Sequence, residues 1–347
     1  MAGSTHEETA RTVLPAAVFA YYRDGIGDQV SRDEAAAAWR DWRFVPRLFR
    51  DVSRVDTEIE LFGARLAGPV LAGPTALHTL ARPEGEAATA RGVEAAGSLL
   101  VLSFRSGRPL EEIPLTRPWW FQAYVLRDRS VTEREVRRAV TAGARAIVLT
   151  ADAPYVPRRG VPEAGPLAPA NRPPGLEQDP ALGPDAISWL AEVSGRPVLV
   201  KGVLRPEDAV ACVAAGAAGV IVSNHGGRQL DRVVATAHAL GPVAEAVGGH
   251  VPVLVDGGIR DGADVLTALA LGARAVLIGR PVLWALATGG ADGVRDRLDS
   301  YREGLARAMA QAGLATLADV DATTVRYVSP VRGHQGPVPD PGSIRRP

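Results

Sequence analysis

Eight short apolar segments recur along the chain, and each is followed by a longer segment that is rich in alanine and has a helical pattern. The short segments are β-branched or aliphatic along nearly their whole length, as strands buried on both faces of a parallel sheet must be. They comprise residues 69–73, 99–103, 119–125, 146–150, 197–201, 219–223, 251–256 and 275–279. The pattern therefore predicts a parallel sheet of eight strands.

The segments between the strands predict helices, several of which end at a glycine followed by alanine. The clearest candidates are Glu84–Ala96, Thr132–Ala142, Pro206–Ala215 and Asp261–Leu271. Eight strand–helix units in about 220 residues fit a closed barrel better than a doubly wound sheet, which usually has fewer strands. We therefore predict an α/β protein with one (β/α)₈ TIM barrel domain over residues 11–328, including a helical segment before the first strand.

The two ends of the chain lack an apolar period. Residues 1–10 are mostly polar, and residues 329–347 are rich in Pro and Gly, so both are expected to be flexible. No segment near the start has the pattern of a signal peptide, and no segment reaches the roughly 18 to 20 apolar residues of a membrane span. These features predict a soluble, cytoplasmic protein without a membrane partner.

The composition indicates a globular protein with a sizeable core, because 46% of the residues are hydrophobic and 22% are charged. Lys+Arg and Asp+Glu both number 39, so no net charge attracts nucleic acid, and none is expected as a partner. Cys212 is the only cysteine, which excludes a disulfide within the chain and indicates a packing role in a helix.

Polar side chains stand where each predicted strand ends. A single Ser or Thr there can be a turn cap, but the carboxyl ends of all barrel strands meet at one rim, so the whole set indicates a site. Lys201 is the most informative member, because a nearly buried lysine requires an anion or a cofactor. The set consists of Thr75, Ser103, Gln122, Tyr124, Thr150, Asp152, Lys201, Ser223, His225, Asp256, Gly279 and Arg280.

The last two strand–helix units have the features of a phosphate site. Gly257 and Gly258 let the backbone approach an anion, Arg260 supplies a guanidinium, and a helix is predicted to begin at Asp261. A second Gly-Arg pair follows the eighth strand, and barrels often bind phosphate in this region. No GxGxxG motif opens a βαβ unit and no Walker loop is present, which favours a mononucleotide over a dinucleotide.

Several of these segments resemble the FMN-dependent α-hydroxy acid oxidase and dehydrogenase family, which includes glycolate oxidase, lactate oxidase and mandelate dehydrogenase. They include "SNHGGRQLD", "VLVDGGIRDGADVLTALALGARAVLIGRP", "FQAYVLRDR" and "RPVLVKGVL". The resemblance extends from about Leu14 to Thr316 and is greatest to hydroxymandelate oxidases. It implies FMN as the cofactor, no metal, and oxidation of an (S)-2-hydroxy acid to the 2-oxo acid. It also implies oxygen or another electron acceptor, and a homotetramer or related oligomer.

The resemblance also implies a role for individual residues. His225 matches the base and Asp152 the residue that orients it, while Tyr124 matches the tyrosine bonded to the reacting substrate. Tyr21, Arg159 and Arg228 match the groups that bind the substrate carboxylate. The implied flavin contacts are Pro74, Thr75, Ala76, Ser103, Gln122, Thr150, Lys201, Ser223, Asp256, Gly257, Gly258, Arg260, Gly279 and Arg280.

Two departures from the family pattern leave alternatives open. The segment after Arg159 is short and rich in proline, so the loop after the fourth strand is expected to be shortened. Arg105 stands where relatives have a tryptophan or a small residue near the substrate side chain. It either points to solvent or, with the shortened loop, admits a large substrate that has a carboxylate, phosphate or other polar tail. An FMN-barrel isomerase or reductase, or a catalytically silent flavin-binding protein whose pocket Arg105 blocks, remains the alternative function.

Overall fold

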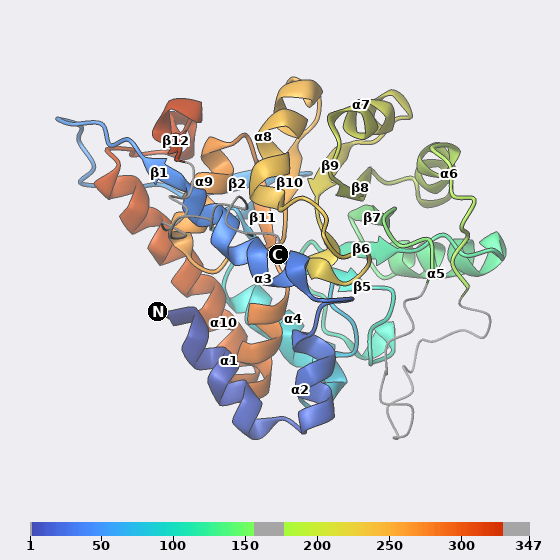
Figure 1. Cartoon of the computed structure of the whole chain (residues 1–347). Helices are drawn as coiled ribbons and strands as arrows, with labels where there is room; N and C mark the ends of the chain where they lie inside the picture. Colours follow the sequence, from blue (N-terminus) through green and yellow to red (C-terminus); the bar gives the residue numbers. More distant parts are fainter. Residues whose placement is uncertain (1, 156–176, 329–347) are drawn as a thin grey trace, which may run out of the picture.

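The computed structural model describes residues 2–155 and 177–328, which form a (β/α)₈ barrel (Figure 1). All eight predicted strands are present and parallel. From β5 to β11 each strand pairs with its neighbours in chain order, and β4 pairs with β11. A bridge between Ala72 and Leu100 joins the first strand to the second and closes the barrel. The strands are β4 (Val70–Ala72), β5 (Val101–Ser103), β6 (Trp120–Ala123), β7 (Ala146–Thr150), β8 (Val198–Val203), β9 (Gly219–Val222), β10 (Val253–Val255) and β11 (Ala275–Ile278).

A helix or long loop follows each strand, and the four helices predicted with definite bounds are confirmed. α5 begins earlier than the pattern suggests, because the side chain of Asp128 caps it by accepting a hydrogen bond from the Ser130 backbone N–H. The helices are α4 (Gly85–Ala95), α5 (Arg129–Thr141), α6 (Asp185–Ser194), α7 (Pro206–Ala214), α8 (Thr236–Val247), α9 (Gly262–Ala270) and α10 (Arg280–Gln311). Within α10, Gly290 has φ 60° and ψ −141°, so α10 is two helices joined at a kink.

The barrel interior is filled by apolar side chains. Leu71, Val148, Leu199, Ile221 and Leu254 are completely buried there. The same cluster includes the hairpin of β2 (Ile59–Leu61) and β3 (Ala64–Leu66), together with residues at the starts of several strands. The hairpin therefore closes the amino-terminal end of the barrel, and the opposite end is left for polar residues.

The amino-terminal segment differs from the expectation of a flexible stretch over residues 1–10. α1 (Ala2–Val13) lies along α10, as Figure 1 shows, and α2 (Ala16–Arg23) follows it. Ala10, Leu14 and Phe19 are buried in a cluster with Leu283 and Trp284 of α10. The helix is therefore held by apolar burial, which the polar sequence of its first residues does not reveal.

Three further elements lie outside the strand–helix repeat. α3 (Val30–Ala38) precedes β1 (Trp42–Phe44), which pairs antiparallel with β12 (Val325–Tyr327) and so brings residues near the two ends of the domain together. No helix in the described parts of the chain combines the length and the apolar character needed to cross a bilayer. Residues 156–176, which include Arg159 and most of the proline-rich segment after it, and the tail at 329–347 lie outside the described residues.

Candidate active site

A cavity opens at the carboxyl-terminal ends of the barrel strands, and most of the predicted site residues line it. Asp152 and Ser223 lie behind the wall and contact residues that line it. Arg159 lies outside the described residues. The predicted residues in the wall are Tyr21, Pro74, Thr75, Ala76, Ser103, Arg105, Gln122, Tyr124, Thr150, Lys201, His225, Arg228, Asp256, Gly257, Gly258, Arg260, Gly279 and Arg280.

An imidazole–carboxylate pair stands at one side of this cavity. Nδ1 of His225 is 3.0 Å and 3.2 Å from the two carboxylate oxygens of Asp152. Burial acts to raise the pKa of Asp152, but the nearby charges of His225 and Lys201 outweigh it and hold the pKa below its ordinary value. A carboxylate at Nδ1 leaves Nε2 as the basic nitrogen and stabilises a protonated ring.

The backbone places both members of this pair. His225 has φ 54°, in the left-handed region, and its N–H donates to Ser223 Oγ at 3.0 Å. Gly202, with φ 110°, lies at a register shift in β8, and a Cβ there would stand 2.5 Å from the side chain of Asp152. The left-handed backbone of His225 and the glycine at position 202 both cost conformational free energy on folding. Such costs are typical of functional sites, where the geometry of the side chains outweighs stability.

A buried lysine faces the same cavity. Nζ of Lys201 is 2.9 Å from Asp256 Oδ2 and donates to Ser223 Oγ at 2.7 Å. Burial acts to lower the pKa of Lys201, but the carboxylates of Asp256 and Asp152 outweigh it and raise the pKa, so the group is a cation. The other carboxylate oxygen of Asp256, Oδ1, is buried and has no hydrogen-bond partner among the described residues.

A row of hydrogen bonds joins the ends of three neighbouring strands. Ser103 donates to Gln122 Oε1 at 3.2 Å, and Gln122 Nε2 donates to Thr150 Oγ1 at 3.0 Å. All three side chains are buried and line the cavity. The row fixes which amide and hydroxyl groups face a planar ligand in the cavity.

The expected phosphate region has the local structure of an anion site. Gly257 and Gly258 have φ 92° and 80°, and a Cβ on Gly258 would stand 2.0 Å from the carbonyl oxygen of Ala35. Side chains there would displace the loop from α3. Arg260 lines the cavity beside them, and Asp261 caps the start of α9.

Several guanidinium groups converge beside this loop. Arg280 donates to the carbonyl oxygens of Tyr22 and Gly226 at 2.9 Å and 2.8 Å. Burial, followed by the positive charges of Arg228, Arg260 and Arg32, lowers the pKa of Arg280 to about 9. So many cations in one buried place raise the free energy of the protein unless an anion joins them.

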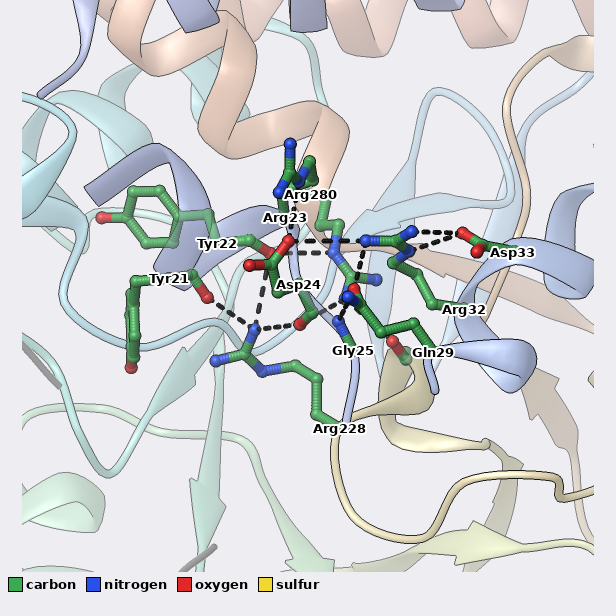
Figure 2. A network of polar contacts seen from close by, with 11 residues as sticks. Tyr21, Tyr22, Arg23, Asp24, Gly25, Gln29, Arg32, Asp33, Arg228 and Arg280 are labelled. Carbon is green, nitrogen blue, oxygen red and sulfur yellow. Dashed lines mark hydrogen bonds and ion pairs between the residues drawn. The ribbon is translucent and has the colours of Figure 1, made fainter. Parts of the chain in front are cut away.

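Arg228 approaches the same stretch of backbone from another element. Figure 2 shows Arg228 and Arg280 both directed at the segment from Tyr21 to Asp24. Nη1 of Arg228 donates to the Tyr21 carbonyl oxygen at 2.7 Å and to the Asp24 carbonyl oxygen at 3.2 Å. These contacts use one nitrogen of the fork and leave the others available to a ligand.

The structure also shows contacts that the sequence analysis did not include. Tyr22 lines the cavity, and its hydroxyl donates to the Leu77 carbonyl oxygen at 2.5 Å. Arg32 of α3 is 3.4 Å from Asp24 Oδ1 in the network of Figure 2. Both come from the segment before the barrel, where no periodic strand pattern indicates which residues reach the rim. The "YY" pair at 21–22 is the one sequence signal in this segment, and the family resemblance assigns a role only to its first tyrosine.

Protonation of Asp264, next to the phosphate loop, gives a testable pH dependence. Burial, and then the charge of Asp261, raises its pKa from 3.8 to about 6. The folded state therefore binds this proton more tightly, and the resulting stabilisation is present at low pH and is lost as the pH rises through about 6. Asp264→Asn keeps an acceptor for the Arg260 N–H without the charge, so the melting temperature of the variant relative to wild type should rise as the pH increases from about 4 to about 7.

Asp296→Asn, at an exposed position of α10, is the matched control, and its difference from wild type should not change with pH. If the difference in melting temperature between Asp264→Asn and wild type were also independent of pH, the buried charge of Asp264 would not destabilise the folded state.

Comparisons with known proteins identify the family. The model of the FMN-dependent dehydrogenase family matches residues 10–173 and 164–327. 2-Hydroxyacid oxidase 1 of Mus musculus is 37% identical over 353 residues, covering 93% of this chain and 95% of that protein. Glycolate oxidase 1 of Oryza sativa subsp. indica is 40% identical over 341 residues, covering 91% and 92%. A crystal structure of mandelate oxidase with (S)-2-phenylpropionate has 41% identity and a TM-score of 0.87, covering 93% of this chain and 97% of that one. Because the family model and these relatives match nearly its whole length, this chain belongs to the FMN-dependent dehydrogenase family.

Proposed function

We propose that this enzyme oxidises an (S)-2-hydroxy acid to the 2-oxo acid, using the basic nitrogen of His225 beside FMN, and that oxygen takes the electrons. The observation that carries the proposal is the His225–Asp152 pair, which shares one cavity with Lys201 and Arg228. Membership of the family and similarity to proteins named 2-hydroxyacid, glycolate and mandelate oxidases support the substrate class.

The residues present suit FMN. The unpaired Oδ1 of Asp256 can accept a hydrogen bond from a hydroxyl of the ribityl chain, and the cationic region of Arg260 and Arg280 suits its phosphate. Gln122 and Thr150 present polar groups, with Ser103, to the edge of a planar ring. The backbone of Pro74, Thr75 and Ala76 would pass along the ring, and Ser223, Gly257, Gly258 and Gly279 would complete the site. When bound, FMN accepts the two electrons that the substrate loses.

His225 has the arrangement required of a general base. Oxidation of a 2-hydroxy acid removes the hydroxyl proton and the hydrogen on C2, and two electrons leave the substrate. Nε2 of His225 takes one proton, and Asp152 at Nδ1 stabilises the imidazolium that results. The same two groups serve whether hydride leaves C2 as the hydroxyl proton is removed, or the base first takes the C2 proton.

The carboxylate of the substrate needs a cation near this base. Arg228 lines the cavity with nitrogens available to a ligand, and its guanidinium carbon is 5.1 Å from the centre of the Tyr21 ring. We assign Arg228 and Tyr21 to the substrate carboxylate, together with Arg159, and Tyr124 to the reacting hydroxyl. Lys201, which lines the cavity as a buried cation, would stabilise the negative charge that FMN gains on reduction.

Product analysis in air tests this function. The purified protein should contain FMN, and incubation with (S)-2-hydroxy acids should give equal amounts of 2-oxo acid and hydrogen peroxide, because each turnover passes two electrons to oxygen. Formation of 2-oxo acid only with an added artificial acceptor would show a dehydrogenase instead. Failure of every 2-hydroxy acid to give a 2-oxo acid under either condition would contradict the proposal.

Arg260→Ala is expected to weaken FMN retention. The substitution removes a charge-assisted contact to phosphate, at a distance from the reacting carbon, and such contacts contribute about 1.5 to 3 kcal/mol. The dissociation constant of FMN should therefore rise by at least about tenfold, while the rate of flavin reduction per bound flavin changes little. Fluorescence titration of the apoprotein with FMN measures the first quantity. An unchanged dissociation constant would remove Arg260 from the phosphate site.

The oligomeric state and the cellular location stay predictions. We propose a homo-oligomer, because the segment before β2 exposes apolar side chains that a partner subunit would cover. Leu48 is 72% exposed and Phe49 is fully exposed, and Phe49 has φ 58°. Large apolar side chains displayed together on a surface are typical of contact regions.

A further inference from the structure

Arg105 extends from the end of β5 into the wall of the active-site cavity. Its guanidinium carbon is 4.9 Å from the centre of the Tyr124 ring, the distance of a cation–π contact. Of the two interpretations of Arg105 from the sequence, the structure therefore supports a position in the cavity rather than in solvent. The ring of Tyr124 is also packed edge-on by Phe104, with ring centres 6.2 Å apart, so the surface on which Arg105 lies is fixed.

The loop that carries Arg105 is held on both sides. The backbone N–H of Arg105 donates to Ser103 Oγ at 3.1 Å, and its carbonyl oxygen accepts from the Leu77 N–H at 3.0 Å. Two residues later, the Gly107 N–H donates to the buried carboxylate of Glu86 at 2.7 Å. The direction in which this side chain leaves the backbone is thus set by the loops after β4 and β5.

The guanidinium of Arg105 has no hydrogen bond or ion pair with any residue in the described ranges 2–155 and 177–328, in contrast to its neighbours. Arg108 in the same loop pairs with Glu112 at 2.7 Å, and Arg228 and Arg280 donate to backbone carbonyls. The cation–π contact with Tyr124 occupies none of the N–H donors of Arg105 with a hydrogen-bond acceptor, so they remain available to a ligand. These donors match a carboxylate, which a planar fork binds through two parallel hydrogen bonds.

The cavity thus contains two stacked guanidinium groups, Arg105 on Tyr124 and Arg228 on Tyr21. Under the proposed function, on which this inference rests, Arg228 binds the carboxylate next to the reacting carbon. We propose that Arg105 binds a second carboxylate at the far end of the substrate, so that the favoured substrates are 2-hydroxy dicarboxylic acids.

Matched substrates test this assignment on the holoenzyme. We would measure kcat/KM for (S)-malate, (S)-2-hydroxyglutarate and (S)-4-carboxymandelate, each beside the analogue whose distal carboxylate is an amide. Wild type should prefer at least one diacid to its amide. For that diacid, Arg105→Met should lower kcat/KM by about ten- to a hundredfold, the scale of a charged hydrogen bond, and change the amide by less than about threefold. Arg105→Lys should retain part of the preference.

Binding gives a second readout that does not depend on turnover. The Kd of the 2-oxo diacid product and of its ω-amide can be measured from the change in flavin absorbance at low and high salt. The diacid should bind more tightly, and its advantage should disappear in Arg105→Met. Arg91→Met, which removes an exposed arginine of α4 outside the cavity, is the matched control and should behave as wild type.

The possible failures are distinguishable. If neutral 2-hydroxy acids are oxidised but no diacid is preferred to its amide, or Arg105→Met affects both members of a pair equally, the second carboxylate site is wrong and the proposed function stands. If no 2-hydroxy acid of either kind is oxidised by wild type, the proposed function fails and this inference fails with it.

Discussion

His225→Gln is expected to retain FMN and to lose turnover by about 10² to 10⁴-fold or more, because the proposed general base is removed while all the proposed cofactor contacts except Ser223 lie outside β9 and the loop that follows it. Glutamine keeps polar groups near Asp152, so the cavity should remain intact. Measurement of kcat together with the ratio of flavin to protein separates the loss of the base from the loss of the cofactor.

The chain offers a matched control for this variant. His238 also has an aspartate at 2.9 Å, Asp41, but this pair lies outside the cavity. His238→Gln should therefore leave kcat close to wild type. A His225→Gln enzyme with nearly normal turnover would show that another group removes the proton.

Lys201→Met is expected to have two large effects. It leaves the buried carboxylate of Asp256 without its cation, and breaking a buried pair in this way costs about 3 to 5 kcal/mol of unfolding free energy. It also removes the charge that stabilises the reduced cofactor, and loss of one such group slows a reaction by about 10² to 10³-fold. Denaturant unfolding measures the first effect, and anaerobic flavin reduction in a stopped-flow instrument measures the second.

A double variant separates these effects. Lys201→Met/Asp256→Asn removes both charges, so most of the unfolding free energy should return, whereas the rate of reduction per bound flavin should stay low. If the rate recovered together with the stability, Lys201 would have only a structural role.

The barrel was predictable because each strand is buried on both faces, and burial appears in the sequence as a continuous apolar run. β7 has the predicted bounds, and β8 continues two residues further than expected because of the register shift at Gly202. The polar groups of the rim were predictable for the same reason, since they directly follow these runs.

Residues outside the strand–helix repeat were harder to predict. Tyr22 of α2 lines the cavity, and Arg32 of α3 lies close enough for its charge to lower the pKa of Arg280. Their positions depend on tertiary packing that has no local pattern. α1 was not predicted because its stability comes from packing against α10, a tertiary contact that leaves no local signal in a mostly polar segment. The family resemblance supplied the roles of Asp152 and Arg228, which no spacing in the sequence could have assigned.

The most direct test of the account is a single anaerobic turnover. Wild-type enzyme with bound FMN is mixed, without oxygen, with an (S)-2-hydroxy acid or with its (R) enantiomer, and flavin absorbance and 2-oxo acid are measured. The account predicts that the (S) acid bleaches the flavin and yields one 2-oxo acid per flavin, and that His225→Gln does so at least about a hundredfold more slowly. An oxidised flavin that no 2-hydroxy acid reduces, or equal rates in both proteins, would contradict it.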